Sequence, residues 1–329
     1  MHETSRRGHL VQGKSDSKDK EIQIVKARLE GLMAAPFTPM NADGSVNLDM
    51  IDKQVESLQR NGVKGAFICG TTGESMSLTA AERQEVARRW MEVAPDDFEV
   101  MVHVGHTSIE LCKSLAAHAQ EIGARGMGAM GPFFYKPQSV EDLVGFCVEV
   151  AAAAPQLPFY YYHIPLMTGV NLPMVDFLKA AAGRIPNLAG IKFSWQDLMD
   201  FGLCRNLDGG RFEMLFGCDE MMLCARVLGA RGFIGSTYNF AALLYIRLLE
   251  AFDAGDMETA CRLQCNSMEM VDVIDRTVGS FLGAAKAVMK MVGVDCGPAR
   301  PPLRNLTPQQ HEGLRAELEK IGFLEYCAK

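Results

Sequence analysis

The chain has 329 residues, of which 48% are hydrophobic, and its formal net charge is −7 at pH 7. This length accommodates one large α/β domain or two ordinary ones. The negative charge and the lack of a basic stripe argue against a nucleic-acid or anionic-membrane partner, and no run of 18 apolar residues could span a membrane. The ten cysteines are scattered, without CxxC pairs, so we expect reduced thiols in a cytoplasmic protein.

The first 28 residues precede any regular apolar pattern. They are polar and of mixed charge, and they lack the apolar segment of a secretory signal. We therefore expect residues 1–28 to form a disordered N-terminal tail.

From Leu29 to about residue 254, short apolar runs alternate with segments of helical periodicity. Eight runs predict buried strands, at 31–36, 64–70, 98–105, 126–132, 157–165, 187–194, 212–217 and 232–237. Asn47, Thr79, Ser108 and Ser139 are expected N-caps of the helices between them. Eight such units predict an α/β fold, a (β/α)8 TIM barrel over residues 29–254, rather than an open doubly wound sheet.

Beyond Gly255 the pattern is helical only. Three amphipathic stretches, at 256–276, 281–293 and 307–322, predict a C-terminal helical extension over residues 255–329 that packs on the barrel.

Lys192 is the first candidate for chemistry, because TIM barrels place reactive groups at the carboxyl ends of their strands. It ends the sixth predicted strand, with no charged residue within four positions on either side. Burial there would lower the pKa of the amine and leave part of it neutral and nucleophilic, able to form a Schiff base with a ketone. The alternative is a structural lysine whose head reaches the barrel mouth for an ion pair.

Tyr162 ends the fifth predicted strand, within "FYYYHIP". Strand alternation places Tyr160 and Tyr162 on the inward face and Tyr161 toward the helices. Tyr162 could therefore exchange a proton with a substrate bound at the neighbouring Lys192. The alternative is a tyrosine that only packs the barrel.

Three other strand ends carry polar side chains. Thr71 and Thr72 lie in "GTTGE", where flanking glycines let hydroxyls and amides converge on an anion such as a carboxylate, or else cap the next helix. Asp219 and Glu220 could bind the hydroxyls of a polyol, although Asp219 could equally be an N-cap. Ser236 follows the eighth strand with no lysine or arginine nearby, which favours a neutral polar ligand over a phosphate.

His103 and His106 lie three residues apart near the end of the third predicted strand. No third ligand joins them in a recognisable spacing, so we do not expect a metal site.

These strand-end motifs together identify a family. "GTTGE" after the second strand, Tyr-x-Ile-Pro ending the fifth and a lysine ending the sixth resemble the class I, Schiff-base-forming pyruvate aldolases of the dihydrodipicolinate synthase/N-acetylneuraminate lyase superfamily. Within it, "GSTYN" (235–239), "GCDE" (217–220) and "FYYYHIPLMTG" (159–169) are similar to the N-acetylneuraminate lyase branch. The resemblance extends from about Leu29 to the C-terminal helices.

The resemblance implies the roles of individual residues. Lys192 would be the Schiff-base nucleophile and Tyr162 the acid/base phenol, while Thr71 and Thr72 would hold the carboxylate of a keto acid. The sugar portion of the substrate would be contacted by Ser194, Gly217, Asp219, Glu220 and Ser236. The reaction implied is the reversible cleavage of N-acetylneuraminate to pyruvate and N-acetylmannosamine, in a homotetramer without metal or organic cofactor.

Two departures argue against the dihydrodipicolinate synthase branch. That branch places an arginine just after its Tyr-x-x-Pro motif, where this chain has Leu166 and Met167. It also sends a tyrosine from the segment after the fourth strand into a neighbouring subunit, where this chain has Phe134. Two alternatives stay open: an aldolase for another sugar keto acid, and a non-catalytic keto-acid-binding paralogue.

Overall fold

Eight parallel strands close into a barrel in the computed structural model, which describes residues 28–329. Each strand pairs with the next one along the chain, and β8 pairs with β1. The strands are β1 (Gly31–Ala34), β2 (Gly65–Ile68), β3 (Glu99–His103), β4 (Gly126–Met130), β5 (Phe159–His163), β6 (Leu188–Phe193), β7 (Glu213–Phe216) and β8 (Gly232–Gly235). The prediction of a TIM barrel is confirmed, whereas the predicted tail lies outside the described residues, apart from its last position.

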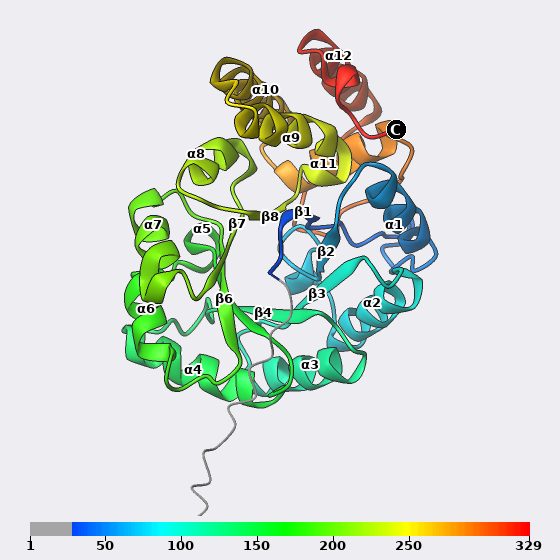
Figure 1. The fold of residues 1–329 in the computed structure, drawn as a ribbon. Helices are drawn as coiled ribbons and strands as arrows, with labels where there is room; N and C mark the ends of the chain where they lie inside the picture. Colours follow the sequence, from blue (N-terminus) through cyan, green and yellow to red (C-terminus); the bar gives the residue numbers. More distant parts are fainter. Residues whose placement is uncertain (1–27) are drawn as a thin grey trace, which may run out of the picture.

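Helices surround the ring of strands (Figure 1). They are α1 (Met50–Arg60), α2 (Ala80–Val93), α3 (Ile109–Glu121), α4 (Val140–Ala152), α6 (Met174–Ala181), α7 (Leu198–Asn206), α8 (Met222–Val227) and α9 (Tyr238–Asp253), with the single turn α5 (Pro165–Thr168) after β5. Thr79 and Ser139 form capping boxes and Ser108 caps α3, as predicted. The cap predicted at Asn47 is wrong, because α1 begins only at Met50 and Asp49 holds the N-cap position.

The strands divide the core into two layers. Inside the barrel, Phe67, Tyr160 and Tyr162 pack together with methionine and aliphatic side chains from the other strands. Tyr161 points the other way, toward the helices, where its ring lies 4.9 Å from that of Phe177 on α6. The alternation predicted for the three consecutive tyrosines is therefore confirmed.

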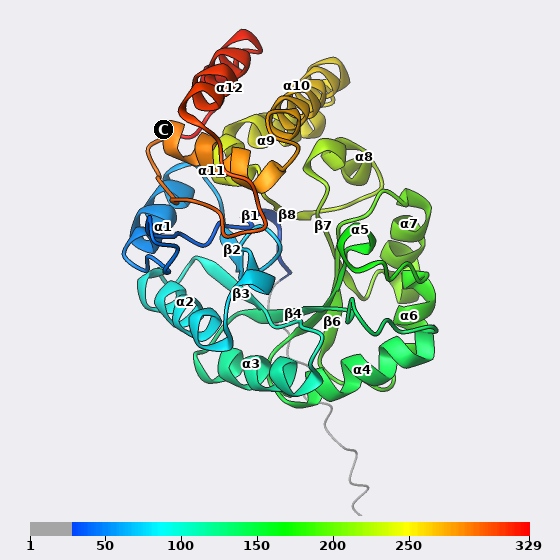
Figure 2. The same ribbon diagram turned by 180° about the vertical axis from the view of Figure 1, so that it is seen from behind.

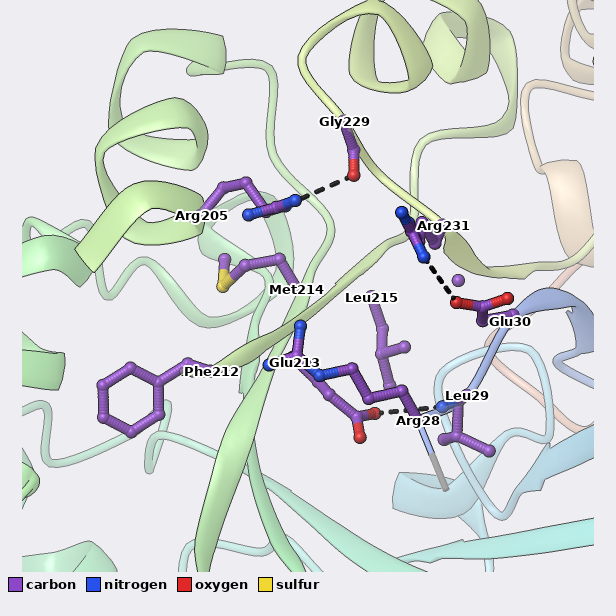
Figure 3. Close-up of a pocket in the computed structure, with 11 residues that line it drawn as sticks. Arg28, Leu29, Glu30, Arg205, Phe212, Glu213, Met214, Leu215, Gly229 and Arg231 are labelled. Carbon is purple, nitrogen blue, oxygen red and sulfur yellow. Dashed lines mark hydrogen bonds and ion pairs between the residues drawn. The ribbon is translucent and has the colours of Figure 1, made fainter. Parts of the chain in front are cut away.

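The amino-terminal end of the barrel is closed by internal polar contacts (Figure 3). Tyr160 donates a hydrogen bond to Glu213 (3.0 Å), which also accepts the Leu29 N–H, and Arg231 pairs with Glu30 at 3.1 Å. The cavity beside them measures about 30 Å³. These contacts tie the segments that precede β1 and β8 to the first residue of β7.

Three further helices, α10 (Met257–Arg276), α11 (Phe281–Met291) and α12 (Pro308–Lys320), gather on one side of the barrel, next to α9 (Figures 1 and 2). Within residues 28–329, no helix combines the length and apolarity needed to cross a bilayer. All ten cysteines are free.

A buried ion pair joins this helical extension to the loop after β2. Lys286 on α11 lies 2.6 Å from Glu74, and both side chains are almost fully buried. Lys286 also donates to the Pro298 carbonyl, and Glu74 accepts the Arg300 N–H. The pair fixes Glu74, the last residue of the "GTTGE" turn, whose φ of 54° is in the strained left-handed region.

Replacing Lys286 by methionine is expected to lower the free energy of unfolding by about 3–5 kcal/mol, because it leaves the buried Glu74 carboxylate without its partner. Equilibrium denaturation with urea measures this. Lys290→Met is the matched control on the same helix: Lys290 is 63% exposed and pairs with Asp295, so its loss should cost less than about 1 kcal/mol. Equal losses for the two variants would show that the buried pair does not hold the extension.

Candidate active site

Lys192 and Tyr162 meet at the carboxyl end of the barrel. The register of β5 and β6 pairs them directly, and both side chains point inward. The Lys192 Nζ lies 4.1 Å from the centre of the Tyr162 ring and 4.3 Å from that of Phe67. The structure therefore brings the two predicted catalytic candidates into contact.

The surroundings of Lys192 disfavour its charged form. The side chain is 3% exposed, and no carboxylate of residues 28–329 forms an ion pair with it. Burial lowers the pKa of Lys192 to about 7, while the charge of Asp219 acts in the opposite direction. A substantial fraction of the amine is therefore neutral at physiological pH, as a nucleophile requires. The alternative of a structural lysine in an ion pair does not fit this environment.

The Tyr162 hydroxyl belongs to a small hydrogen-bonded group. It lies 3.3 Å from the Thr71 hydroxyl. Burial raises the pKa of Tyr162 to about 12, while hydrogen bonds with Thr71 and Ser194 act in the opposite direction. The phenol is therefore protonated before any reaction starts and can act first as an acid.

The "GTTGE" turn points its hydroxyls toward the barrel mouth. Thr72 lies 2.6 Å from the Ser236 hydroxyl, so the second and eighth strand ends are joined. The short 3₁₀ turn at Ser75–Ser77 has no side-chain cap, and α2 is capped by Thr79. The helix-capping alternative for Thr71 and Thr72 is therefore excluded.

Asp219 is held rigidly below the mouth. Its Oδ2 accepts hydrogen bonds from the Thr237 N–H (2.9 Å) and hydroxyl (2.6 Å), and the Tyr238 hydroxyl also bonds to this carboxylate. Its backbone carbonyl accepts from Gln264 and Ser267 of α10. Asp219 does not cap α8, so that alternative is excluded. Burial raises the pKa of this carboxyl, and Thr237 opposes that shift.

Ser194, Gly217 and Glu220 complete this side of the mouth. The Ser194 Oγ would lie 2.1 Å from a Cβ at position 217, so only glycine leaves room for it. Glu220 is partly buried, and burial together with the neighbouring Asp219 raises its pKa. All nine predicted site residues thus lie at or just beyond the carboxyl ends of the strands.

The two histidines lie in different environments. His103 is buried, with Nδ1 3.0 Å from the Cys69 carbonyl and its ring against that of Tyr162. His106 accepts a hydrogen bond from the Ser108 N–H. No group of three potential metal ligands occurs within residues 28–329.

Apolar side chains surround the outer rim of the mouth. Phe134 and Tyr135 are 73% and 85% exposed after β4, and Leu166 is 82% exposed on α5. Neither of the two residues after Pro165 brings a positive charge to the site.

Sequence reasoning missed two contacts of the site. Phe67 forms a second aromatic wall beside Lys192, and Thr237 fixes the Asp219 carboxylate. Phe67 carried a readable signal, because it is a large aromatic residue on the inward parity of a strand that was predicted correctly. Thr237 carried none, because its contact with Asp219 depends on how two loops meet.

The fold and site define a TIM-barrel protein with a buried, weakly basic lysine beside a tyrosine at the carboxyl end of the strands. The chain belongs to the dihydrodipicolinate synthetase family, whose model matches residues 28–321. It is 41% identical to the N-acetylneuraminate lyase of Rattus norvegicus over 305 residues, which cover 92% of this chain and 95% of that protein.

Solved structures show the same likeness. The N-acetylneuraminate lyase of Proteus mirabilis matches with a TM-score of 0.87 and 39% identity, covering 90% of this chain and 99% of that one. The dihydrodipicolinate synthase of Cyanidioschyzon merolae matches with a TM-score of 0.82 but only 26% identity, over 90% of this chain and 99% of that one.

Proposed function

We propose that this protein catalyses the reversible aldol cleavage of N-acetylneuraminate to pyruvate and N-acetylmannosamine through a Schiff base on Lys192. The observation that carries the proposal is a buried lysine, with a pKa lowered to about 7, in contact with Tyr162 at the barrel mouth. The identity to the N-acetylneuraminate lyases of Rattus norvegicus and Proteus mirabilis, which is higher than that to the dihydrodipicolinate synthase, supports the choice of substrate.

The mechanism begins with attack of the neutral Lys192 amine on the C2 ketone of the open-chain sugar acid. As the carbinolamine loses water, Tyr162 donates its proton to the leaving hydroxide, and a cationic iminium and a phenolate result. The phenolate then takes the C4 hydroxyl proton. The electron pair of the C3–C4 bond moves into the iminium, which releases N-acetylmannosamine and leaves an enamine. Protonation at C3 and hydrolysis release pyruvate and the free amine.

The substrate would be oriented by the remaining residues of the mouth. The hydroxyls and amides of Thr71 and Thr72 suit the carboxylate next to C2, because the glycines that flank them let the turn close around an anion. The sugar hydroxyls would be bound by the polar groups across the mouth, which belong to Ser194, Gly217, Asp219, Glu220 and Ser236.

A coupled assay of pyruvate release tests the choice of substrate. We expect kcat/KM for N-acetylneuraminate to exceed that for 2-keto-3-deoxygluconate by at least about tenfold, since a site built to bind specific hydroxyls rejects a substrate that leaves them unpaired. The reverse order would assign the protein to another sugar keto acid. Binding of pyruvate without turnover of either sugar acid would indicate a non-catalytic paralogue.

The pH dependence of kcat/KM follows from the pKa of Lys192. Because its pKa is lowered to about 7, the amine is protonated below this pH and loses its nucleophilic lone pair. We expect kcat/KM to rise about tenfold per pH unit below pH 7 and to level off above it. Initial rates between pH 5 and 10 measure this. A value of kcat/KM that keeps rising up to pH 10 would show that the amine is as basic as in water.

We also propose a homotetramer that acts in the cytoplasm. The exposed apolar residues Phe134, Tyr135 and Leu166 at the rim support contact between copies of the chain, since monomers rarely expose such side chains together. Light scattering coupled to size-exclusion chromatography measures the oligomeric state.

A further inference from the structure

We propose that Phe67 is a further functional residue of this site, whose ring face stabilises positive charge on the Lys192 nitrogen. The charge exists in the resting ammonium form and again in the iminium. The stabilisation of the iminium rests on the proposed function, whereas the stabilisation of the ammonium does not.

The two aromatic rings form a corner around the nitrogen. The Phe67 and Tyr162 rings meet at 81°, with their centres 5.5 Å apart, and Nζ lies over both faces, at 4.3 and 4.1 Å. A cation over a ring face within about 6 Å is attracted by the ring quadrupole, most strongly where water is excluded. With no carboxylate paired to Lys192 in the described part of the chain, these faces are its nearest source of stabilisation.

The structure holds the Phe67 ring in place. A Cβ at position 128 would lie 2.8 Å from the ring, and a Cβ at position 70 would lie 3.1 Å from it. The ring therefore fits because both positions are glycines. The His103 ring packs against its edge, with ring centres 5.9 Å apart, and Phe67 is completely buried. The ring therefore cannot turn its face away from Nζ without moving the backbone of β4.

Other charged or titratable groups also act on this nitrogen. Asp219, from the segment after β7, favours the cation, whereas a protonated His103 on β3 would oppose it. Burial raises the pKa of the neighbouring Cys218 thiol, which is therefore neutral and exerts no such attraction. Burial keeps the pKa of His103 well below its usual value, so that ring is neutral. Tyr162 supplies the other aromatic face, but its hydroxyl also exchanges protons. Phe67 has no polar atom in its side chain, so it can affect the Lys192 nitrogen only through the shape and the quadrupole of its ring.

Fluorination separates these two properties. We would place phenylalanine with one, two or three ring fluorines at position 67 by site-specific incorporation, which weakens the quadrupole stepwise and changes the shape little. The first readout is the pH midpoint for labelling of Lys192 by an amine-selective reagent, followed by peptide mass mapping. The second is the equilibrium constant of the pyruvate adduct, from the fraction trapped by borohydride at pH 8.

We expect the labelling midpoint to fall in graded steps, by about one pH unit in total, and the adduct constant to fall by about 5- to 30-fold. The same series at Phe201 is the matched control, because that ring is equally buried but packs against Phe193 and Phe216, away from Nζ. It should change neither readout.

A labelling midpoint that stays constant through the Phe67 series would overturn the inference and leave Phe67 as a packing residue. A failure of the unmodified protein to form any pyruvate adduct would instead contradict the proposed function. The labelling midpoints would still decide whether the ring stabilises the ammonium.

Discussion

Lys192→Ala is expected to lower kcat on N-acetylneuraminate by on the order of 10⁴-fold or more, because no other group of the site can form the iminium. An unactivated ketone is a poor electron sink for C3–C4 cleavage, so the reaction loses its covalent route altogether. The coupled assay of pyruvate release measures the loss. Residual activity above one per cent of the unmodified protein would contradict the mechanism.

Borohydride reduction in the presence of pyruvate identifies the lysine directly, and the protein contains its own control. Lys286 is as deeply buried as Lys192, but it forms an ion pair with Glu74 at 2.6 Å. Its nitrogen is bound by the Glu74 carboxylate and donates to the Pro298 carbonyl, so it should not react. We expect the adduct on the peptide that contains Lys192 and none on the peptide that contains Lys286.

Tyr162→Phe is expected to lower kcat by about 10²–10⁴-fold, the range for losing a positioned acid/base group, with a small change in KM. The ring face over Lys192 remains in this variant, so the pyruvate adduct should still form, only more slowly. Steady-state kinetics and the rate of borohydride trapping measure the two effects separately. A loss confined to KM would assign Tyr162 a binding role only.

Tyr160→Phe is the matched control for this variant. Tyr160 lies on the same strand and on the same inward face, but its hydroxyl bonds to Glu213 at the opposite end of the barrel. We expect its loss to affect stability and to leave kcat unchanged within about twofold.

The C-terminal helices support the site from outside the barrel. Gln264 and Ser267 of α10 hold the backbone carbonyl of Asp219, and Lys286 of α11 holds Glu74 at the end of the "GTTGE" turn. Substitutions in this extension can therefore change catalysis without touching the substrate, since they displace groups that must keep their positions to within a fraction of an ångström.

The sequence by itself determined the barrel and the two central residues of the site. Eight buried strands separated by helical periodicity leave few other arrangements, and the two-residue period of a strand decides which side chains face inward. Tyr162 and Lys192 could be placed on the inward face because each lies at the end of a strand with a clear apolar run. The caps at Thr79, Ser108 and Ser139 were equally readable, because they depend only on local chain geometry.

Only the tertiary structure decided how the loops and layers meet. Asn47 is a residue type that often caps helices, but α1 begins later and Asp49 holds the N-cap position. The sequence left Asp219 between a cap and a ligand, and the hydrogen bonds from Thr237 excluded the cap. Phe67 and Lys192 are 125 positions apart and meet across the barrel interior, where a glycine of β4 and one in the turn after β2 leave space for the ring. Such contacts depend on packing between distant segments, which neither residue spacing nor periodicity encodes.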